Sequence, residues 1–141
     1  MTAGLATIAP DAEMAVREYL RTVDLGAADK RVFFGRPDDG TFPYVSVDGQ
    51  IGGATDPDLP ASSVRMQITV HGSGRNATRA IADRVSAHLS AVASTVVTIP
   101  SGTARLDQID VTGGPNFVPD NTAKVARFVI TAVVALRHTA L

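Results

Sequence analysis

The sequence contains no cysteine. Disulfide bonds, thiolate zinc sites and a cysteine nucleophile are therefore excluded. Because no covalent cross-link is available, the folded state must be stabilised by packing or by assembly with other chains.

An excess of charge of either sign is also absent. The chain has 13 lysines and arginines against 14 aspartates and glutamates, which gives a formal net charge of -1. Non-specific binding to nucleic acid depends on clustered Lys and Arg. We therefore do not expect nucleic acid to be the partner.

Signals for export and for membrane insertion are missing as well. Residues 1–10 lack the basic start and the continuous apolar stretch of a signal peptide. The most apolar segment, residues 125–136, is interrupted by Arg127 and Thr131 and is too short to cross a bilayer as a helix. We expect an intracellular protein without a membrane span.

The length and composition suit a single folded domain. With 141 residues, of which 45% are hydrophobic and 19% charged, the chain is long enough for one sizeable core and too short for two. We expect residues 1–141 to form one α+β domain.

Two segments have the periodicity of helices. The first opens at Asp11, which can cap the free amides of the first turn, and we expect it to end at Gly26. The second follows Gly72-Ser73-Gly74. Arg79 and Asp83 stand four residues apart in it and are expected to pair on the surface. The apolar residues that recur at helical spacing are Ala12, Val16, Leu20 and Val23 in the first segment and Ala77, Ile81, Val85, Leu89 and Val92 in the second.

Six segments have the composition or the alternation of strands: residues 31–35, 42–47, 64–71, 95–99, 104–112 and 124–137. The turn residues 37–40 (PDDG) predict that the first two strands form a hairpin. Residues 48–63 are rich in Gly, Pro and Asp and are expected to be irregular, and residues 113–116 are expected to be a turn. The resulting order αβββαβββ predicts a mixed, mainly antiparallel sheet with both helices packed on one face.

No arrangement of residues predicts catalysis. The histidines, His71, His88 and His138, show no ligand spacing. The glycines of residues 72–74 lie between a strand and a helix, where backbone amides can bind phosphate, but no P-loop lysine follows. We expect no catalytic residue, no metal and no cofactor.

Several residues are candidates for contacts with other protein chains. Arginine is enriched at protein interfaces, and apolar residues in a glycine-rich segment are typical of docking surfaces. The candidates are the arginines beside Phe33-Phe34, those on helix two, and two apolar residues of the 48–63 segment: Arg31, Arg36, Arg75, Arg79, Arg84, Ile51 and Leu59.

Four segments together resemble a known family. They are residues 11–20 (DAEMAVREYL), residues 42–47 (FPYVSV) followed by Gly52-Gly53, residues 64–72 (VRMQITVHG), and the helix beginning at Asn76-Ala77. In order and spacing, over about residues 10 to 93, the chain is similar to the tail terminator proteins of long-tailed bacteriophages, in particular those of phages of actinobacteria.

The resemblance implies a structural virion protein and not an enzyme. Its subunits would form a homo-hexameric ring that caps the tail tube, ends tube polymerisation and offers a surface to the head-tail connector. The implied partners are copies of itself, the tail tube protein and the connector protein, and DNA would pass through the ring without specific binding. The implied location is the head-proximal end of the virion tail, after assembly in the host cytoplasm.

Three other hypotheses remain open from the residues. The protein could be another head-tail connector, neck or minor tail protein. A small-molecule binding domain would use a crevice near His71, Ser73 and Arg75. A nucleic-acid binding module would need the arginines to form one continuous stripe.

Overall fold

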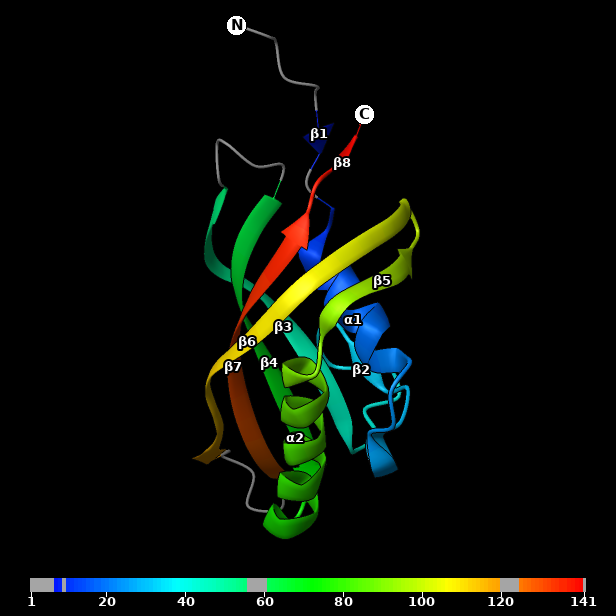
Figure 1. Ribbon diagram of the computed structural model, residues 1–141. Coiled ribbons are helices and arrows are strands. Elements are labelled where there is room, and N and C mark those ends of the chain that lie inside the picture. Colours follow the sequence, from blue (N-terminus) through cyan, green and yellow to red (C-terminus); the bar gives the residue numbers. More distant parts are fainter. Residues whose placement is uncertain (1–6, 9, 56–60, 120–124, 141) are drawn as a thin grey trace, which may run out of the picture.

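The computed structural model describes residues 7–8, 10–55, 61–119 and 125–140, and the side chains of residues 10–49, 62–119 and 125–138. Two helices, a 3-10 turn and a curled six-stranded sheet form the body of the molecule (Figure 1). The elements are β1 (Thr7–Ile8), α1 (Ala12–Arg21), η1 (Gly26–Ala28), β2 (Val32–Phe33), β3 (Tyr44–Thr55), β4 (Ala61–Ser73), α2 (Arg75–Ser90), β5 (Ala93–Ile99), β6 (Gly102–Pro119), β7 (Val125–Arg137) and β8 (Thr139–Ala140). The predicted α+β class is confirmed.

The six-stranded sheet has the order β2-β3-β4-β7-β6-β5. Only the β2–β3 pair among these neighbours is parallel, and the other four pairs are antiparallel. β7 therefore lies in the interior of the sheet and joins β2-β3-β4 to β6-β5. A separate pair, β1–β8, which the sequence did not predict, lies at the opposite end of the molecule from the start of α2 (Figure 1).

The central pair, β4–β7, fixes which side chains enter the core. Its register is unbroken from Ala61↔Arg137 to Ser73↔Val125. Partners across an antiparallel pair share a face of the sheet, and successive residues alternate between faces. The alternation predicted for residues 64–71 is confirmed, because Val64, Met66, Ile68 and Val70 are all buried.

The buried faces of both helices and one face of the sheet form a single hydrophobic cluster. Aliphatic side chains dominate it, as expected for a chain in which aromatic residues are only 5%. Its largest fully buried members are Phe128, Leu20, Leu25, Met66, Ile68, Leu89, Leu106, Ile130 and Leu136.

Helix α1 begins as predicted but ends earlier. The Asp11 carboxylate accepts a hydrogen bond from the Met14 amide at 3.1 Å, which caps the first turn. The helix stops at Arg21, and the Thr22 hydroxyl bonds back to the Tyr19 carbonyl at 2.7 Å. Gly26, which was expected to end α1, instead begins η1 with a φ of +69°, a conformation that favours glycine.

Helix α2 covers the predicted segment as far as Ser90, so that Val92 lies beyond its end, and it sits close to β4. The chain turns from strand to helix at Gly74, where φ is +90°. The Thr78 hydroxyl donates to the Gly74 carbonyl at 2.6 Å, and a Cβ added to Gly72 would overlap Thr78. Gly72 is therefore required by the close approach of the helix to the strand.

The predicted hairpin of residues 31–35 and 42–47 is wrong. β2 runs parallel to β3, with Val32 opposite Val45. The turn at residues 37–40 exists, but the intervening loop closes around the Arg31 side chain. Arg31 Nε donates to the Pro43 carbonyl at 2.9 Å, and its guanidinium forms an ion pair with Asp39 at 3.2 Å. Bonds of this side chain set the chain path, and the turn composition does not reveal them.

Two segments predicted to be irregular or a turn are largely strand. β3 continues to Thr55 and β4 starts at Ala61, so residues 48–55 and 61–63 of the expected irregular segment are strand. Residues 56–60 lie outside the described residues. β6 likewise runs through the predicted turn at residues 113–116. Register shifts at these glycine-rich places accommodate the extra residues. Pairing with a long neighbouring strand has overridden the local turn preference.

Candidate interaction surfaces

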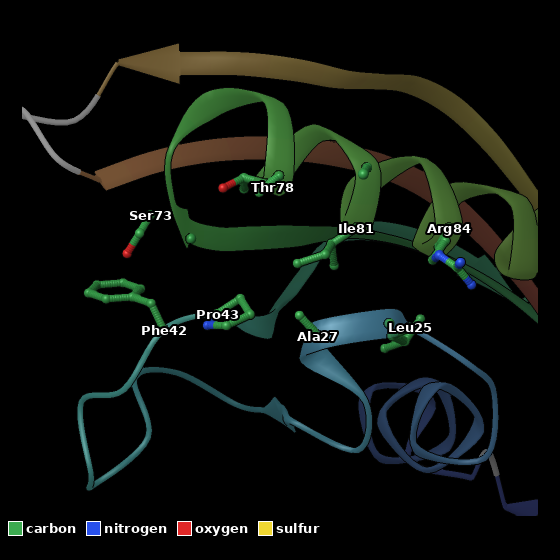
Figure 2. A pocket seen from close by; sticks show the side chains of 12 residues that line it. Leu25, Ala27, Phe42, Pro43, Ser73, Thr78, Ile81 and Arg84 are labelled. Atoms are coloured by element: carbon green, nitrogen blue, oxygen red, sulfur yellow. The ribbon is translucent and has the colours of Figure 1, made fainter.

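An apolar pocket opens beside the N-terminal half of α2. It has a volume of about 350 Å³ and lies between α2, η1 and the segment that leads into β3 (Figure 2). Its walls are Leu25, Gly26, Ala27, Phe42, Pro43, Gly72, Ser73, Ala77, Thr78, Ala80, Ile81 and Arg84. Carbon atoms line most of it, so it suits an apolar group better than a charged one.

Charged residues hold the rim of this pocket. Arg84 forms an ion pair with Asp24 at 3.2 Å, and the Asp24 carboxylate also accepts the Gly26 amide at 2.9 Å. The bond from Gly26, followed by the charge of Arg84, lowers the pKa of Asp24. A ring nitrogen of His88 lies 2.9 Å from the Asp24 carbonyl oxygen. These bonds fasten the segment before η1 to the side of α2.

An exposed pair of an aromatic and a cationic side chain lies beside the other flank of α2. The Arg75 guanidinium is 4.6 Å from the centre of the Phe117 ring. Phe117 is 39% exposed, and its ring also contacts Phe128, with 5.5 Å between ring centres. Arg79 forms the predicted ion pair with Asp83 at 2.9 Å. Together Arg75 and Phe117 form an exposed apolar and positively charged knob.

A polar basin lies on the face of the sheet opposite the hydrophobic cluster. Its volume is about 570 Å³. The Asp48 carboxylate accepts hydrogen bonds from the hydroxyls of Ser46, at 2.6 Å, and of Thr69. A nitrogen of His71 lies 3.1 Å from the Ser46 hydroxyl. The lining residues are Asp48, Gln67, Thr69, His71, Asn116, Val118, Arg127 and Val129.

Arg127 is the least satisfied group of this basin. Its Nε is buried and, among the described residues, has no hydrogen-bond partner. A buried donor without a partner is unfavourable. The Arg127 guanidinium gives the basin a positive charge, which suits polar or acidic groups better than basic ones.

The structure separates the arginines that the sequence grouped together. Arg31 is committed to its own loop, whereas Arg84 stands at the pocket rim and Arg75 and Arg79 lie on the other flank of α2. Arg36 is exposed and forms no ion pair within the described ranges. Of the two apolar candidates, Ile51 lies in β3 with its side chain outside the described residues, and Leu59 lies outside them entirely.

Sequence reasoning missed Phe117 and located the pocket only in part. Of the three residues of the predicted crevice, Ser73 lines the pocket, whereas His71 lines the polar basin and Arg75 contacts Phe117. The pocket is built from segments around residues 25, 42 and 80, which no local pattern connects. Phe117 carried one signal, an aromatic residue placed directly after a run of Gly, Pro and Asn, where a solvent-facing position is common.

In the part of the chain that the structure describes, no three His, Asp or Glu side chains are grouped so that they could hold a metal ion. Neither α1 nor α2 has the length and the apolar character of a membrane-spanning helix.

The fold is similar to that of solved structures, although sequence comparisons find no match. No protein-family model matches the chain, and no curated protein sequence does. A chain of the virion of a native gene transfer agent (GTA) particle has a similar structure, with a TM-score of 0.67 over 89% of this chain and 94% of that chain, at 19% sequence identity. The fold is shared with a virion chain. At this identity the likeness concerns the fold, and it spans nearly the whole of both chains.

Proposed function

We propose that this protein is a structural component of a phage-like virion, and specifically a tail terminator. In this role a homo-hexameric ring of subunits caps the tail tube, ends its polymerisation and provides the surface for head-tail joining. The proposed partners are other copies of the chain, the tail tube protein and the head-tail connector.

The observation that carries this proposal is the match to a virion chain over 89% of one chain and 94% of the other. A match of that extent means that the whole domain, and not a fragment of it, shares the fold of the virion chain. The resemblance of residues 10–93 to tail terminators, drawn from the sequence independently of the fold, narrows the proposal from virion protein to terminator.

The surfaces of the molecule support a role in assembly. A ring requires two different patches on each subunit, one to bind each neighbour. The apolar pocket and the Phe117 knob are two such patches. The Arg127 basin provides a third surface, available to a partner of another kind. The net charge of -1 suits a channel through which DNA slides, because strong phosphate contacts would retain it.

The role is tested by electron microscopy of particles made with this gene inactivated. A terminator predicts tails of excessive and variable length beside filled heads that carry no tail. Restoring the wild-type gene in trans should restore virions of normal length. Expressing a copy with an early stop codon is the matched control.

A second candidate, a connector or other neck protein, is supported by the same structural match, because a virion contains neck proteins as well as tail proteins. The same micrographs separate the two. Tails of normal length that fail to join heads would move the function to the neck. Virions of normal appearance would contradict both.

A further inference from the structure

We propose that Phe117 of one copy enters the apolar pocket of the next copy, so that the two flanks of α2 form one repeating contact. The inference rests on the proposed self-assembly and identifies the surfaces that carry it. The occupant of the pocket is a second copy of this chain. The contact places an aromatic side chain in an apolar pocket whose rim carries the Arg84–Asp24 ion pair.

The first support is the position of the two patches around α2. Successive residues of a helix are about 100° apart. Arg75 and Arg79, which contact the aromatic rings of β6 and β7, are therefore on one flank. Ala77, Ala80 and Arg84, which line the pocket, are about 140–200° from Arg75 and so on the other flank.

The core lies between these flanks. Val85 and Leu89 of α2 are fully buried and point to the sheet. The same arrangement is visible in the ribbon views, in which β6 passes on one side of α2 and η1 on the other (Figures 1 and 2). One copy cannot place its own Phe117 in its own pocket, so the contact requires a second copy.

The second support is that both patches lie at the same end of α2. Arg75, which covers Phe117, is the first residue of the helix, and the pocket begins two residues later at Ala77. A neighbour joined through these two patches is therefore displaced little along α2. A heterologous contact with little translation can close into a ring, whereas one with a large translation builds a filament.

The third support is the fit of an aromatic ring to the pocket. A cavity of about 150 Å³ lined by apolar side chains is sufficient for benzene, and this pocket measures about 350 Å³. The Phe117 side chain is 39% exposed, so placing its exposed edge in the pocket removes apolar surface of both copies from water. The remaining volume leaves room for the atoms that flank the ring.

The fourth support is complementary charge. Arg75 has no carboxylate partner among the described residues, and insertion of Phe117 would carry it to the pocket rim. Asp24 lies at that rim, paired with Arg84, and Asp29 follows η1, whose residues line the pocket. Asp29 is exposed and forms no ion pair within the described ranges. A cation meeting these carboxylates fixes the orientation of the two copies.

The absence of cysteine makes the contact directly testable, because any introduced pair is unique. The variant carries Phe117→Cys and Ala27→Cys in the full chain, and Ala27 lies across the pocket from α2 (Figure 2). A disulfide requires Cα atoms within about 7 Å. Because the two positions are on opposite sides of α2, a bond within one chain is not expected.

Mild oxidation of this variant should give a ladder of dimers, trimers and larger species on a non-reducing gel, which a reductant abolishes. A mixture of the two single-cysteine variants should stop at the dimer. The matched control is Val96→Cys with Ala27→Cys, because Val96 on β5 is also apolar and is 65% exposed. Melting temperatures of all variants establish that each is folded.

A second pair of variants tests the orientation. Arg75→Glu in the cysteine variant should reduce the ladder at least several-fold, and adding Asp29→Arg should restore part of it. A ladder no stronger than that of the Val96 control would overturn the proposal. The proposal would also be overturned if the Phe117→Cys variant alone formed dimers as efficiently, since such dimers require position 117 of one copy to lie beside position 117 of another. A small molecule retained in native mass spectrometry, with no ladder, would reassign the pocket to a ligand.

The outcome is distinguishable from the test of the proposed function. A ladder from a protein whose inactivation leaves virions normal would uphold the contact and reject the terminator. Overlong tails without a ladder would uphold the terminator and reject this contact.

Discussion

The two faces of β7 differ although they belong to one strand. On the inner face Phe128, Ile130 and Leu136 are at most 1% exposed and pack in the cluster with the helices. On the outer face Arg127 and Val129 are only half-buried and line the polar basin. The inner face carries the stability of the single chain, while the outer surfaces and the flanks of α2 remain available to other molecules.

The largest expected effect comes from truncating adjacent residues of β7. Ile130→Ala should destabilise the protein by about 2–5 kcal/mol, because it leaves a cavity in the core. Val129→Ala, one residue away on the outer face, should lower the free energy of unfolding by only about 1 kcal/mol. Urea unfolding measures both. Equal losses would mean that the outer face is as important to the single chain as the core.

Two neighbouring glycines of β6 extend this comparison of adjacent positions in one strand. A Cβ at Gly114, where φ is +94°, would overlap the Val129 carbonyl, whereas a Cβ at Gly113 would lie 3.9 Å from Thr131. Gly114→Ala should therefore destabilise the protein by about 1–3 kcal/mol, and Gly113→Ala should be close to neutral. Hydrogen exchange should show lost protection at the end of β6 in Gly114→Ala alone. Protection unchanged in both variants would contradict the required close approach.

The smallest expected effect is the pH dependence of the loop around Arg31. A hydrogen bond from Arg31, together with the Thr41 amide, lowers the pKa of Asp39. Since the unfolded value is about 3.9, this stabilisation is present above about pH 4 and is lost as the pH falls through the folded value. Asp39→Asn should therefore lower stability at pH 7 and match the wild type more closely at pH 2.

The control for this pH dependence is Asp38→Asn. The Asp38 side chain is exposed and has no ion pair within the described residues, so its removal should leave the difference between pH 7 and pH 2 unchanged. A loss of stability in Asp39→Asn that is the same at both pH values would contradict the linkage.

Local patterns predicted the elements that local forces determine. α1, α2 and the alternation of β4 and β7 follow from the spacing of apolar residues, which packing on one side of an element imposes. The parallel β2–β3 pair and the continuation of β3 and β6 through glycine-rich segments were not predicted. They depend on hydrogen bonds to Arg31 and to distant strands, which no short window contains.

The candidate interaction surfaces were likewise predicted only in part. Arg75, Arg79 and Arg84 were selected from composition, but only the coordinates show that Arg84 faces the pocket and the other two face the aromatic rings. The pocket itself required residues from three separate segments to converge. Whether the selected arginines contact a partner stays a prediction.

The interior position of β7 also determines when the sheet can be completed during synthesis. β7 is the last of the six strands to leave the ribosome, yet it joins the β2-β3-β4 block to the β6-β5 block. Until it emerges, β4 and β6 expose edges that it will later occupy. The nascent chain therefore cannot present a finished sheet surface until residues 125–137 have been translated.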